Sequence, residues 1–455
     1  MNAKFLSAIA LMGMAGAATG QVIPSPVNEL LNTGFENGSF EGVFADWNTF
    51  GGNISQDFAE FVISDSASAK IFGNFATDDG GNPVPSTNGL FQDVFSLAVT
   101  PGDRWRAELD AAHLMGDEME GTNALRLVVV YIDTLGPLGG DPQGNYVEQS
   151  FTMIDSTTPT TDDPANTPRY SVDLVAPLGV DRAQIVIALD QGTEDTDMDG
   201  NFGEGAAYLD NAFLGLVEEN AVIPFYDGGF ETAAPFQQAF NGWAQFDAGF
   251  NLFRAGGPGD PGLASQAFEG EWFAFMFGQF NGEQNDTVAI QRLPASEGED
   301  WKASIQSRHA TGDEIAGNNS GFLAIQFYDA AGNQLFDNGI TTLTAASPTD
   351  VWTEFEATGT APANTSEVRI VMGYQQQDDA GGAIWYDAAM LELDEGGCNV
   401  ADLALPFDLL DLSDIDAFIA AFVGGDAAAD IAAPFGVIDL SDIDAFIAAF
   451  FAGCP

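Results

Sequence analysis

Residues 124–133, ALRLVVVYID, form a short apolar segment rich in β-branched residues, and three further segments share this character. They are AQIVIALD at 183–190, GFLAIQFYDA at 321–330 and EVRIVMGY at 367–374. Clusters of Gly, Asn, Asp and Pro separate them. Short segments of this kind with turn signals between them, and no long helical pattern, predict antiparallel β-sandwiches. We therefore expect a mainly β fold.

The sequence that contains these segments is an internal repeat of two copies. Gly34-Phe35-Glu36 in NTGFENGSFEGVFADWNTFGGN aligns with Gly229-Phe230-Glu231 in YDGGFETAAPFQQAFNGWAQFDAGFN. Further on, GDRWRAELDAAHLMGDEMEG aligns with GEDWKASIQSRHATGDEIAG, and Asp210 aligns with Asp387. We expect two tandem antiparallel β-sandwich domains, at residues 22–219 and 220–395, because each copy has an ordinary domain size.

A different repeat closes the sequence: DLSDIDAFIAAF stands at 411–422 and again at 439–450. Ile415, Phe418, Ile419 and Phe422 recur at helical spacing, and Ser413 and Asp416 have the spacing of a capping box. Each repeat predicts a loop followed by one short helix. Two such helices are unstable alone and should pack face to face, giving a small all-α domain at residues 398–455.

The first twenty residues, MNAKFLSAIALMGMAGAATG, have the order of a secretory signal peptide: a charge, an apolar run and small residues. We expect cleavage near Gln21 and a secreted or cell-surface protein. No later run approaches the roughly 20 apolar residues of a spanning helix.

The charge balance is strongly acidic. The chain has 68 Asp and Glu against 12 Lys and Arg, a formal net charge of -56. Nucleic acid and anionic membranes would be repelled. With 45% hydrophobic residues and 37 Phe the chain can still build cores, so the acids indicate a solvated surface. Such a surface suits a salty medium or a protein that collects divalent cations.

The two cysteines, Cys398 and Cys454, bracket the terminal repeat. In an exported protein this arrangement favours a disulfide, which would stabilise by roughly 4 kcal/mol in the chain-entropy treatment. Two free thiols are the alternative.

Residues 398–455 resemble a dockerin of the type bracketed by Cys and ending in Gly-Cys. Dockerins are duplicated half EF-hands that bind a cohesin partner or otherwise anchor the protein. The resemblance implies a cohesin-like or envelope partner and calcium ligands in each loop. The matching ligand positions are Asp402, Asp411, Asp414, Asp430, Asp439 and Asp442.

The loops depart from the dockerin pattern. Ala404, Pro406, Ala432 and Pro434 stand where the family places Asn or Asp, so each loop lacks two oxygens. Since Ca²⁺ takes six to eight oxygens, two outcomes are open. Either calcium binds weakly, or the disulfide and the Phe-rich core hold the segment.

The two upstream copies are similar to the jelly-roll sandwiches of carbohydrate-binding modules, on an early Gly-Phe-Glu and an aromatic-x-Asp near the end of each copy. In that family the Glu and the Asp hold a structural calcium. The resemblance implies two such sites, Glu36 with Asp210 and Glu231 with Asp387, in which the ion would clamp the termini. Ordinary exposed carboxylates are the alternative.

Two further patterns have competing interpretations. DTDMDGNFGEG at 195–205 begins like an EF-hand loop, but Ala206 occupies the closing position. His113 and His309, the two histidines, both stand in His-x-x-Gly-Asp-Glu. They could act as a base or metal ligand, but a duplicated loop-capping role is favoured, because one enzyme rarely needs two copies of its site.

We predict no catalytic residues. The sequence has no Ser-His-Asp elbow and no phosphate loop, although 68 carboxylates could hide a hydrolase pair. For a sugar ligand, aromatic ring faces would stack on the C–H surfaces of pyranoses. The candidates are Trp47, Trp243, Trp272 and Trp352, and for each of them taken singly a place in the core is the favoured alternative.

Together these observations indicate a secreted, non-catalytic binding or surface protein with a dockerin-like anchor, with polysaccharide as the candidate ligand. The alternatives are a polysaccharide hydrolase and a purely structural component of the cell surface.

Overall fold

The protein is mainly β, as predicted, and consists largely of antiparallel sheets. The computed structural model describes residues 21–37, 44–73, 84–94, 99–132, 146–192, 205–232, 240–246, 252–257, 260–377, 379–394, 400–403, 410, 412–424, 429, 431–432 and 438–453. The expected signal peptide, the DTDMDG stretch and both cysteines lie outside these residues.

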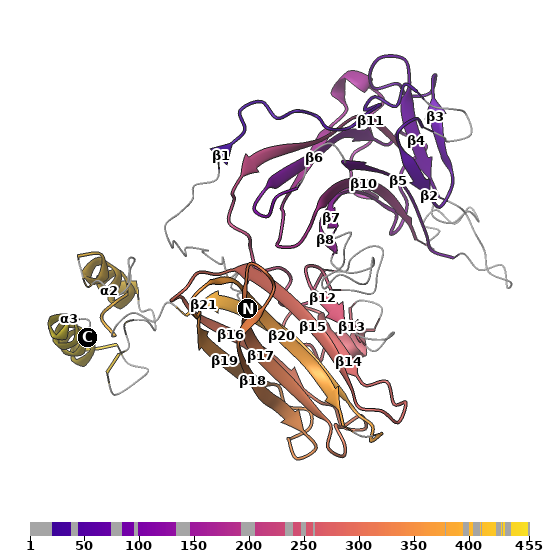
Figure 1. Ribbon diagram of the computed structural model, residues 1–455. Helices are drawn as coiled ribbons and strands as arrows, with labels where there is room; N and C mark the ends of the chain where they lie inside the picture. Colours follow the sequence, from indigo (N-terminus) through magenta and orange to yellow (C-terminus); the bar gives the residue numbers. More distant parts are fainter. Residues whose placement is uncertain are drawn as a thin grey trace.

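Strands β1 to β11 form two sheets (Figure 1). One has the order β3-β4-β11-β6-β9, with β1 beside β11, and the other has the order β2-β5-β10-β7-β8. The strands are β1 Gln21–Val22, β2 Asn48–Phe50, β3 Ile54–Asp57, β4 Ser68–Phe72, β5 Ser86–Val94, β6 Arg104–Ala112, β7 Ala124–Ile132, β8 Tyr146–Asp155, β9 Arg169–Val175, β10 Arg182–Gln191 and β11 Ala206–Glu219.

Strands β12 to β21 repeat this arrangement. Their sheets have the orders β13-β14-β21-β16-β19 and β12-β15-β20-β17-β18, which match the first pair strand for strand. The strands are β12 Ala244–Phe246, β13 Leu252–Gly256, β14 Trp272–Phe277, β15 Asn285–Pro294, β16 Asp300–Arg308, β17 Ser320–Asp329, β18 Gln334–Thr344, β19 Thr353–Thr360, β20 Thr365–Gln376 and β21 Ala383–Leu393. The internal repeat is therefore a repeat of topology.

Alternation along the strands builds the cores. On β6, Trp105 and Leu109 are buried while Arg104 and Glu108 between them are not, as the two-residue period of a strand requires. One core cluster draws on both sheets of the first pair, and a second draws on both sheets of the other pair. Each copy thus has its own core.

Polar contacts join the two copies. The Tyr226 hydroxyl donates to the Val175 carbonyl at 2.6 Å. The Asn241 side chain accepts from the Glu148 amide at 2.9 Å and donates to the Glu148 carbonyl at 2.8 Å. Hydrogen bonds from side chains to the backbone of the other copy satisfy its polar groups and hold the neighbouring segments together.

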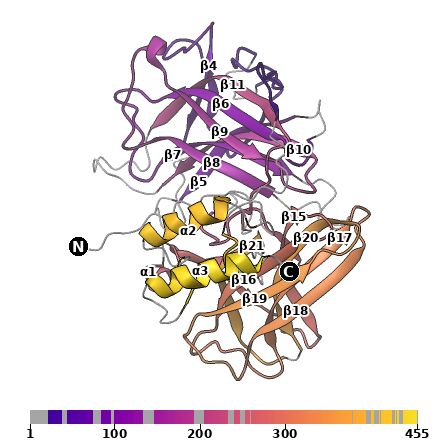
Figure 2. The ribbon, with the colours of Figure 1, turned by 90° about the vertical axis from the view of Figure 1, so that its left-hand side faces the viewer.

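The helices among the described residues are few and short: the 3₁₀ turn η1 Pro164–Asn166, α1 Pro261–Ala264, α2 Leu412–Gly424 and α3 Leu440–Ala452. Helices α2 and α3 occur where the duplicated apolar spacing predicts them and lie side by side (Figure 2). Asp439 caps α3, and its side chain accepts from the Ser441 amide at 2.8 Å. Within the described part of the chain, no helix combines the length and apolarity needed to cross a bilayer.

Candidate functional site

The first predicted calcium pair, Glu36 and Asp210, converges on one turn. Asp210 Oδ2 accepts from the amide and hydroxyl of Ser64, at 2.8 and 2.9 Å. Glu36 Oε1 accepts from the amides of Ser66 and Ala67, at 3.1 and 3.2 Å. Both carboxylates therefore hold the turn that leads into β4, although they stand 174 positions apart (210 minus 36).

The second pair repeats this arrangement. Asp387 Oδ2 accepts from the amides of Phe268 and Glu269, at 2.8 and 3.2 Å. Glu231 Oε1 accepts from the amides of Glu271 and Trp272, at 3.0 and 2.9 Å. The turn that these two carboxylates hold leads into β14 (Trp272–Phe277).

The backbone of the Gly-Phe-Glu signature explains how the Glu reaches this turn. Phe35 and Phe230 have positive φ angles of 54° and 55° and are fully buried. Left-handed backbone is rare for a bulky residue, so the tight turn is maintained by burial of the ring. It places the aromatic side chain in the core and leaves the next residue, the Glu, at the surface.

In each pair the buried aspartate is held where its charged form is disfavoured. Burial raises the pKa of Asp210 to about 6, and the neighbouring Glu36 carboxylate adds to the shift. Burial likewise raises the pKa of Asp387 to about 7, with Glu269 adding to it. A bound cation would favour the charged form of each aspartate. Oxygen-rich pairs therefore suit Ca²⁺ chemically, but no group of three or more Asp, Glu, His or Cys among the described residues could hold a metal.

Two of the predicted calcium ligands of the C-terminal segment accept backbone hydrogen bonds from the preceding loops. Asp414 Oδ1 accepts from the Leu403 amide at 2.8 Å, and Asp442 Oδ1 accepts from the amides of Ile431 and Ala432 at 2.9 and 2.8 Å. Hydrogen bonds from the Asp439, Ala432 and Ile431 amides outweigh burial and hold the pKa of Asp442 below its usual range. Each helix start thus anchors the preceding loop through a carboxylate.

For the predicted calcium ligands Asp402, Asp411 and Asp430, the structure gives little or no contact information. Asp402 is buried at 4% exposure. Asp411 and Asp430 lie outside the described residues. Calcium in these loops remains a prediction, as does the Cys398–Cys454 disulfide.

Trp47 and Trp243 are not sugar platforms. They are 6% and 2% exposed and pack on Phe35 and Phe230, with ring centroids 5.0 and 5.5 Å apart. The Trp47 indole donates to the Asn32 carbonyl at 3.1 Å. Their predicted role in ligand binding is wrong, because the Gly-Phe-Glu turn draws both rings into the core.

Trp272 and Trp352 are half-buried, and Trp352 borders a group of aromatic rings that the sequence reasoning missed. The Arg254 guanidinium lies 3.7 Å from the Trp272 ring centroid. The Trp352 indole donates to the Gln266 carbonyl at 2.9 Å and its ring lies 6.4 Å from Phe273. Trp352 thus lies with the rings of the outer face of β14, whereas Trp272, by alternation along the strand, shares the face of Ala274 and Met276.

Four phenyl rings form a row on that face, which we call the aromatic row: Phe253, Phe275, Phe277 and Phe280. Phe253 stacks on Phe275 with centroids 4.9 Å apart and an interplanar angle of 25°. Phe275 lies 5.9 Å from Phe277, which lies 6.2 Å from Phe280 at an angle of 8°. The first three are half-buried and Phe280 is exposed.

The row faces away from the core of the second copy. Ala274 and Met276 alternate with the phenylalanines of β14 and belong to the core between the two sheets. Because successive side chains of a strand point to opposite faces, Phe275 and Phe277 lie on the outer face. The three rings of the row on β13 and β14 thus lie on one side of the sheet.

The first copy carries polar residues at two of the three matching strand positions and Phe72 at the third, which matches Phe277. In the first copy β11 pairs with β4, and Tyr208 stands opposite Lys70. In the second copy β21 pairs with β14 in the same way, and Trp385 stands opposite Phe275. Across the next pair, Ser55 faces Lys70 and Phe253 faces Phe275. Lys70 forms ion pairs with Glu60 and Asp117, each at 3.0 Å. The stacked pair of Phe253 and Phe275, and with it a continuous row of rings, is therefore specific to the second copy.

Both histidines have the duplicated structural role that we favoured. His113 Nε2 lies 2.8 Å from the Thr158 carbonyl and its Nδ1 accepts from the Met119 amide at 3.1 Å. His309 repeats this with the Ser347 carbonyl and the Ile315 amide, at 3.0 and 3.2 Å. Each buried imidazole bridges loops, with both nitrogens engaged.

The chain matches no known protein family by sequence, and no curated protein is significantly similar to it. Among solved structures, the tandem CBM22-1-CBM22-2 domain of Paenibacillus barcinonensis Xyn10C is 13% identical, covering 83% of this chain and 99% of that chain, with a TM-score of 0.24. TmCBM61 in complex with beta-1,4-galactotriose is 13% identical, covering 41% and 97%, with a TM-score of 0.24.

A third solved structure is the enzymatically active domain of tailspike protein 4 from bacteriophage CBA120. It is 14% identical, covering 42% of this chain and 22% of that chain, with a TM-score of 0.26. Similarities of this size carry no inference about function.

Proposed function

We propose that this is a secreted or cell-surface protein that binds neutral polysaccharide through the aromatic row of its second copy. The observation that carries the proposal is the placement of the row. On the outer faces of two sheets with the same strand order, the second copy bears Phe253 and Phe275 where the first bears Ser55 and Lys70, and only the position of Phe277 has a ring in both copies. Half-exposed rings side by side offer flat apolar surface to the C–H faces of sugars, and such surface suits a ligand site.

The charge of the chain favours a neutral ligand over an acidic one. The arginines near the row already have partners: Arg254 donates to the Glu231 carbonyl at 2.5 Å, and Arg308 donates to Asp350 at 3.0 Å. With a formal net charge of -56, the protein would repel a polyanion.

The proposal extends to the layout of the chain. The duplicated strand order and the separate cores support two tandem jelly-roll-like sandwiches, at residues 22–219 and 220–395. The paired helices α2 and α3 support a dockerin-like segment at 398–455 that docks to a cohesin-like or envelope partner. Structural Ca²⁺ at the two carboxylate pairs, with Glu36 and Asp210 in the first, is supported by their convergence and by the raised pKa values of the Asp residues.

The experiment is affinity electrophoresis of the full chain through gels containing neutral glucans, xylans or galactans, with a polyuronide as the anionic comparison. Phe275→Lys installs the residue of the first copy and should abolish retardation. Phe277→Ala should weaken it, whereas Phe72→Ala at the matching position of the first copy should not.

Two results would overturn the proposal. Release of reducing ends from a retained polysaccharide would indicate the hydrolase alternative. Absence of retardation with every polysaccharide would indicate the structural alternative.

A further inference from the structure

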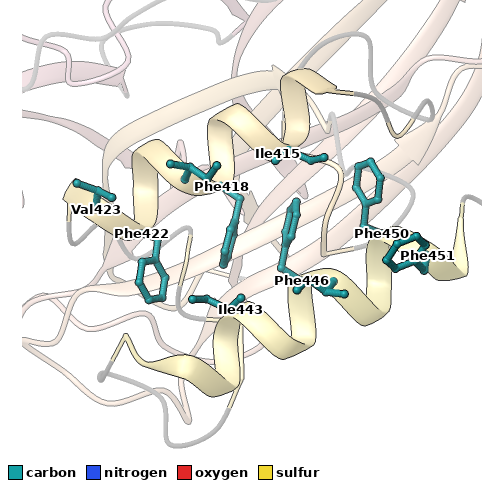
Figure 3. A pocket seen from close by; sticks show the side chains of 10 residues that line it. Ile415, Phe418, Phe422, Val423, Ile443, Phe446, Phe450 and Phe451 are labelled. Atoms are coloured by element: carbon teal, nitrogen blue, oxygen red, sulfur yellow. The ribbon is translucent and has the colours of Figure 1, made fainter.

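The two C-terminal helices enclose an apolar groove with a volume of about 340 Å³ (Figure 3). Figure 3 shows Ile415 beside Phe450 and Phe422 beside Ile443, so the helices run antiparallel. All ten lining residues are apolar, and they are five equivalent pairs: Ile415 and Ile443, Phe418 and Phe446, Ile419 and Ile447, Phe422 and Phe450, Val423 and Phe451.

The rims of this groove are exposed. Ile419 and Ile447 are 53% and 46% exposed, and Val423 and Phe451 are 81% and 84% exposed. Single exposed apolar residues are ordinary, but a contiguous apolar face marks a site of interaction. Ile419 and Ile447 occupy the same position in the two copies of the twelve-residue repeat. The exposed apolar face is therefore duplicated along with the sequence.

The charge around the groove restricts its occupant. Residues 398–455 contain ten Asp and no Glu, Lys, Arg or His, a net charge of -10. The exposed Asp416 and Asp444 precede Ile419 and Ile447 by three positions, which places each acid beside the rim. A second copy of the chain would bring the same acids to the contact, and an anionic membrane would be repelled.

We infer that this groove docks a partner protein whose apolar ridge is flanked by Lys or Arg, with Phe451 as the anchoring side chain. The inference rests on the proposed docking role of this segment and specifies the chemistry of the partner. Four of the five lining pairs are identical, and the fifth replaces Val423 by Phe451. Aromatic residues dominate binding energy at interfaces, so the half of the groove around Phe451 should contribute more than the half around Val423.

The probe is a synthetic amphipathic helical peptide with a Leu face flanked by Lys, and its binding to the full chain is followed by fluorescence anisotropy. One comparison peptide has Glu in place of Lys, and another has Ser in place of Leu. The protein variants are Phe451→Ala and Val423→Ala. Met115→Ala, which truncates a 72% exposed side chain of the first copy, is the control.

We expect the Leu/Lys peptide to bind, with affinity reduced about tenfold or more by Phe451→Ala, less by Val423→Ala and not by Met115→Ala. Equal binding of the Leu/Glu or Ser/Lys peptide, or unchanged binding by Phe451→Ala, would overturn the inference. A dimer in sedimentation velocity that Phe451→Ala dissociates would also overturn it, because a second copy would then be the occupant.

Polysaccharide retardation of the same variants separates this inference from the proposed function. Phe451→Ala should leave retardation unchanged, so loss of peptide binding with intact sugar binding supports the groove alone. The anchoring role is tested separately by deleting residues 398–455. If the truncated protein stays at its normal location while the Leu/Lys peptide binds the groove of the full chain, the proposed anchoring fails and the groove chemistry stands.

Discussion

Truncation of Phe446 should unfold the C-terminal helical pair. Phe446 is 5% exposed and its ring stacks on Phe418, with centroids 4.1 Å apart and an interplanar angle of 15°. The two rings are the only large side chains among the four buried residues described in this cluster, since the others are Ala401 and Ala429. Phe446→Ala therefore removes one of the two buried rings of this cluster, on which the partly buried Phe450 also packs.

Whether the helical pair unfolds depends on how the free-energy cost of the substitution compares with the total stability of the segment. A buried Phe→Ala substitution costs about 3–5 kcal/mol, and a core of this size rarely supplies more than about 3–5 kcal/mol in total. The substitution should therefore consume most of the stability of the segment. Phe451→Ala on the same helix removes an exposed ring and should change stability by less than about 0.5 kcal/mol.

Hydrogen exchange on the full chain measures this directly. Amides of α2 and α3 should exchange about 100-fold faster or more in Phe446→Ala, because each 1.4 kcal/mol is a factor of ten. Exchange in β16 and β20 should not change. Slow exchange of both helices in Phe446→Ala would refute the reasoning, because something other than the stacked rings would then hold the pair.

The remaining predictions concern protons, ions and the disulfide. In EDTA, the free energy of unfolding contributed by Asp387 should be present at low pH and decline as the pH rises through about 7, because the folded state keeps a proton that the unfolded state has lost. Asp387→Asn should flatten this dependence of the unfolding free energy on pH, measured by urea titration at each pH. An unchanged pH dependence in Asp387→Asn contradicts the prediction. EDTA should lower the melting temperature of each sandwich, and identical melting with and without calcium would remove the predicted sites. Reduction of Cys398 and Cys454 should unfold the isolated segment 398–455 in circular dichroism, whereas chelation should matter less; the reverse order would show that ions hold it.

The sequence allowed the strands and the two C-terminal helices to be predicted, because the apolar residues have the period of the structure they form. ALRLVVVYID lies across β7, and the repeated DIDAFIAAF lies within α2 and α3. The convergence of Glu36 with Asp210 was predicted from resemblance and not from spacing, since nothing local brings the two ends of a copy together.

The aromatic row was missed for a physical reason. FAFMF at 273–277 is uniformly apolar, so its alternation between core and surface cannot be seen in the sequence alone. The signal lay in the comparison of copies, where SAKIF at 68–72 has Lys70 at the position of Phe275. Trp47 and Trp243 misled because an aromatic residue beside a tight turn can face either way, and here hydrogen bonding and the buried Phe draw it inward.

The most direct test of sugar binding by the second copy is to exchange residues between the copies. Phe275→Lys and Lys70→Phe should be compared in affinity electrophoresis on the neutral polysaccharide that retards the wild-type chain most. We predict that Phe275→Lys abolishes retardation and that Lys70→Phe retains it. Retardation that survives Phe275→Lys and is lost in Lys70→Phe would place the ligand on the first copy and contradict the proposal.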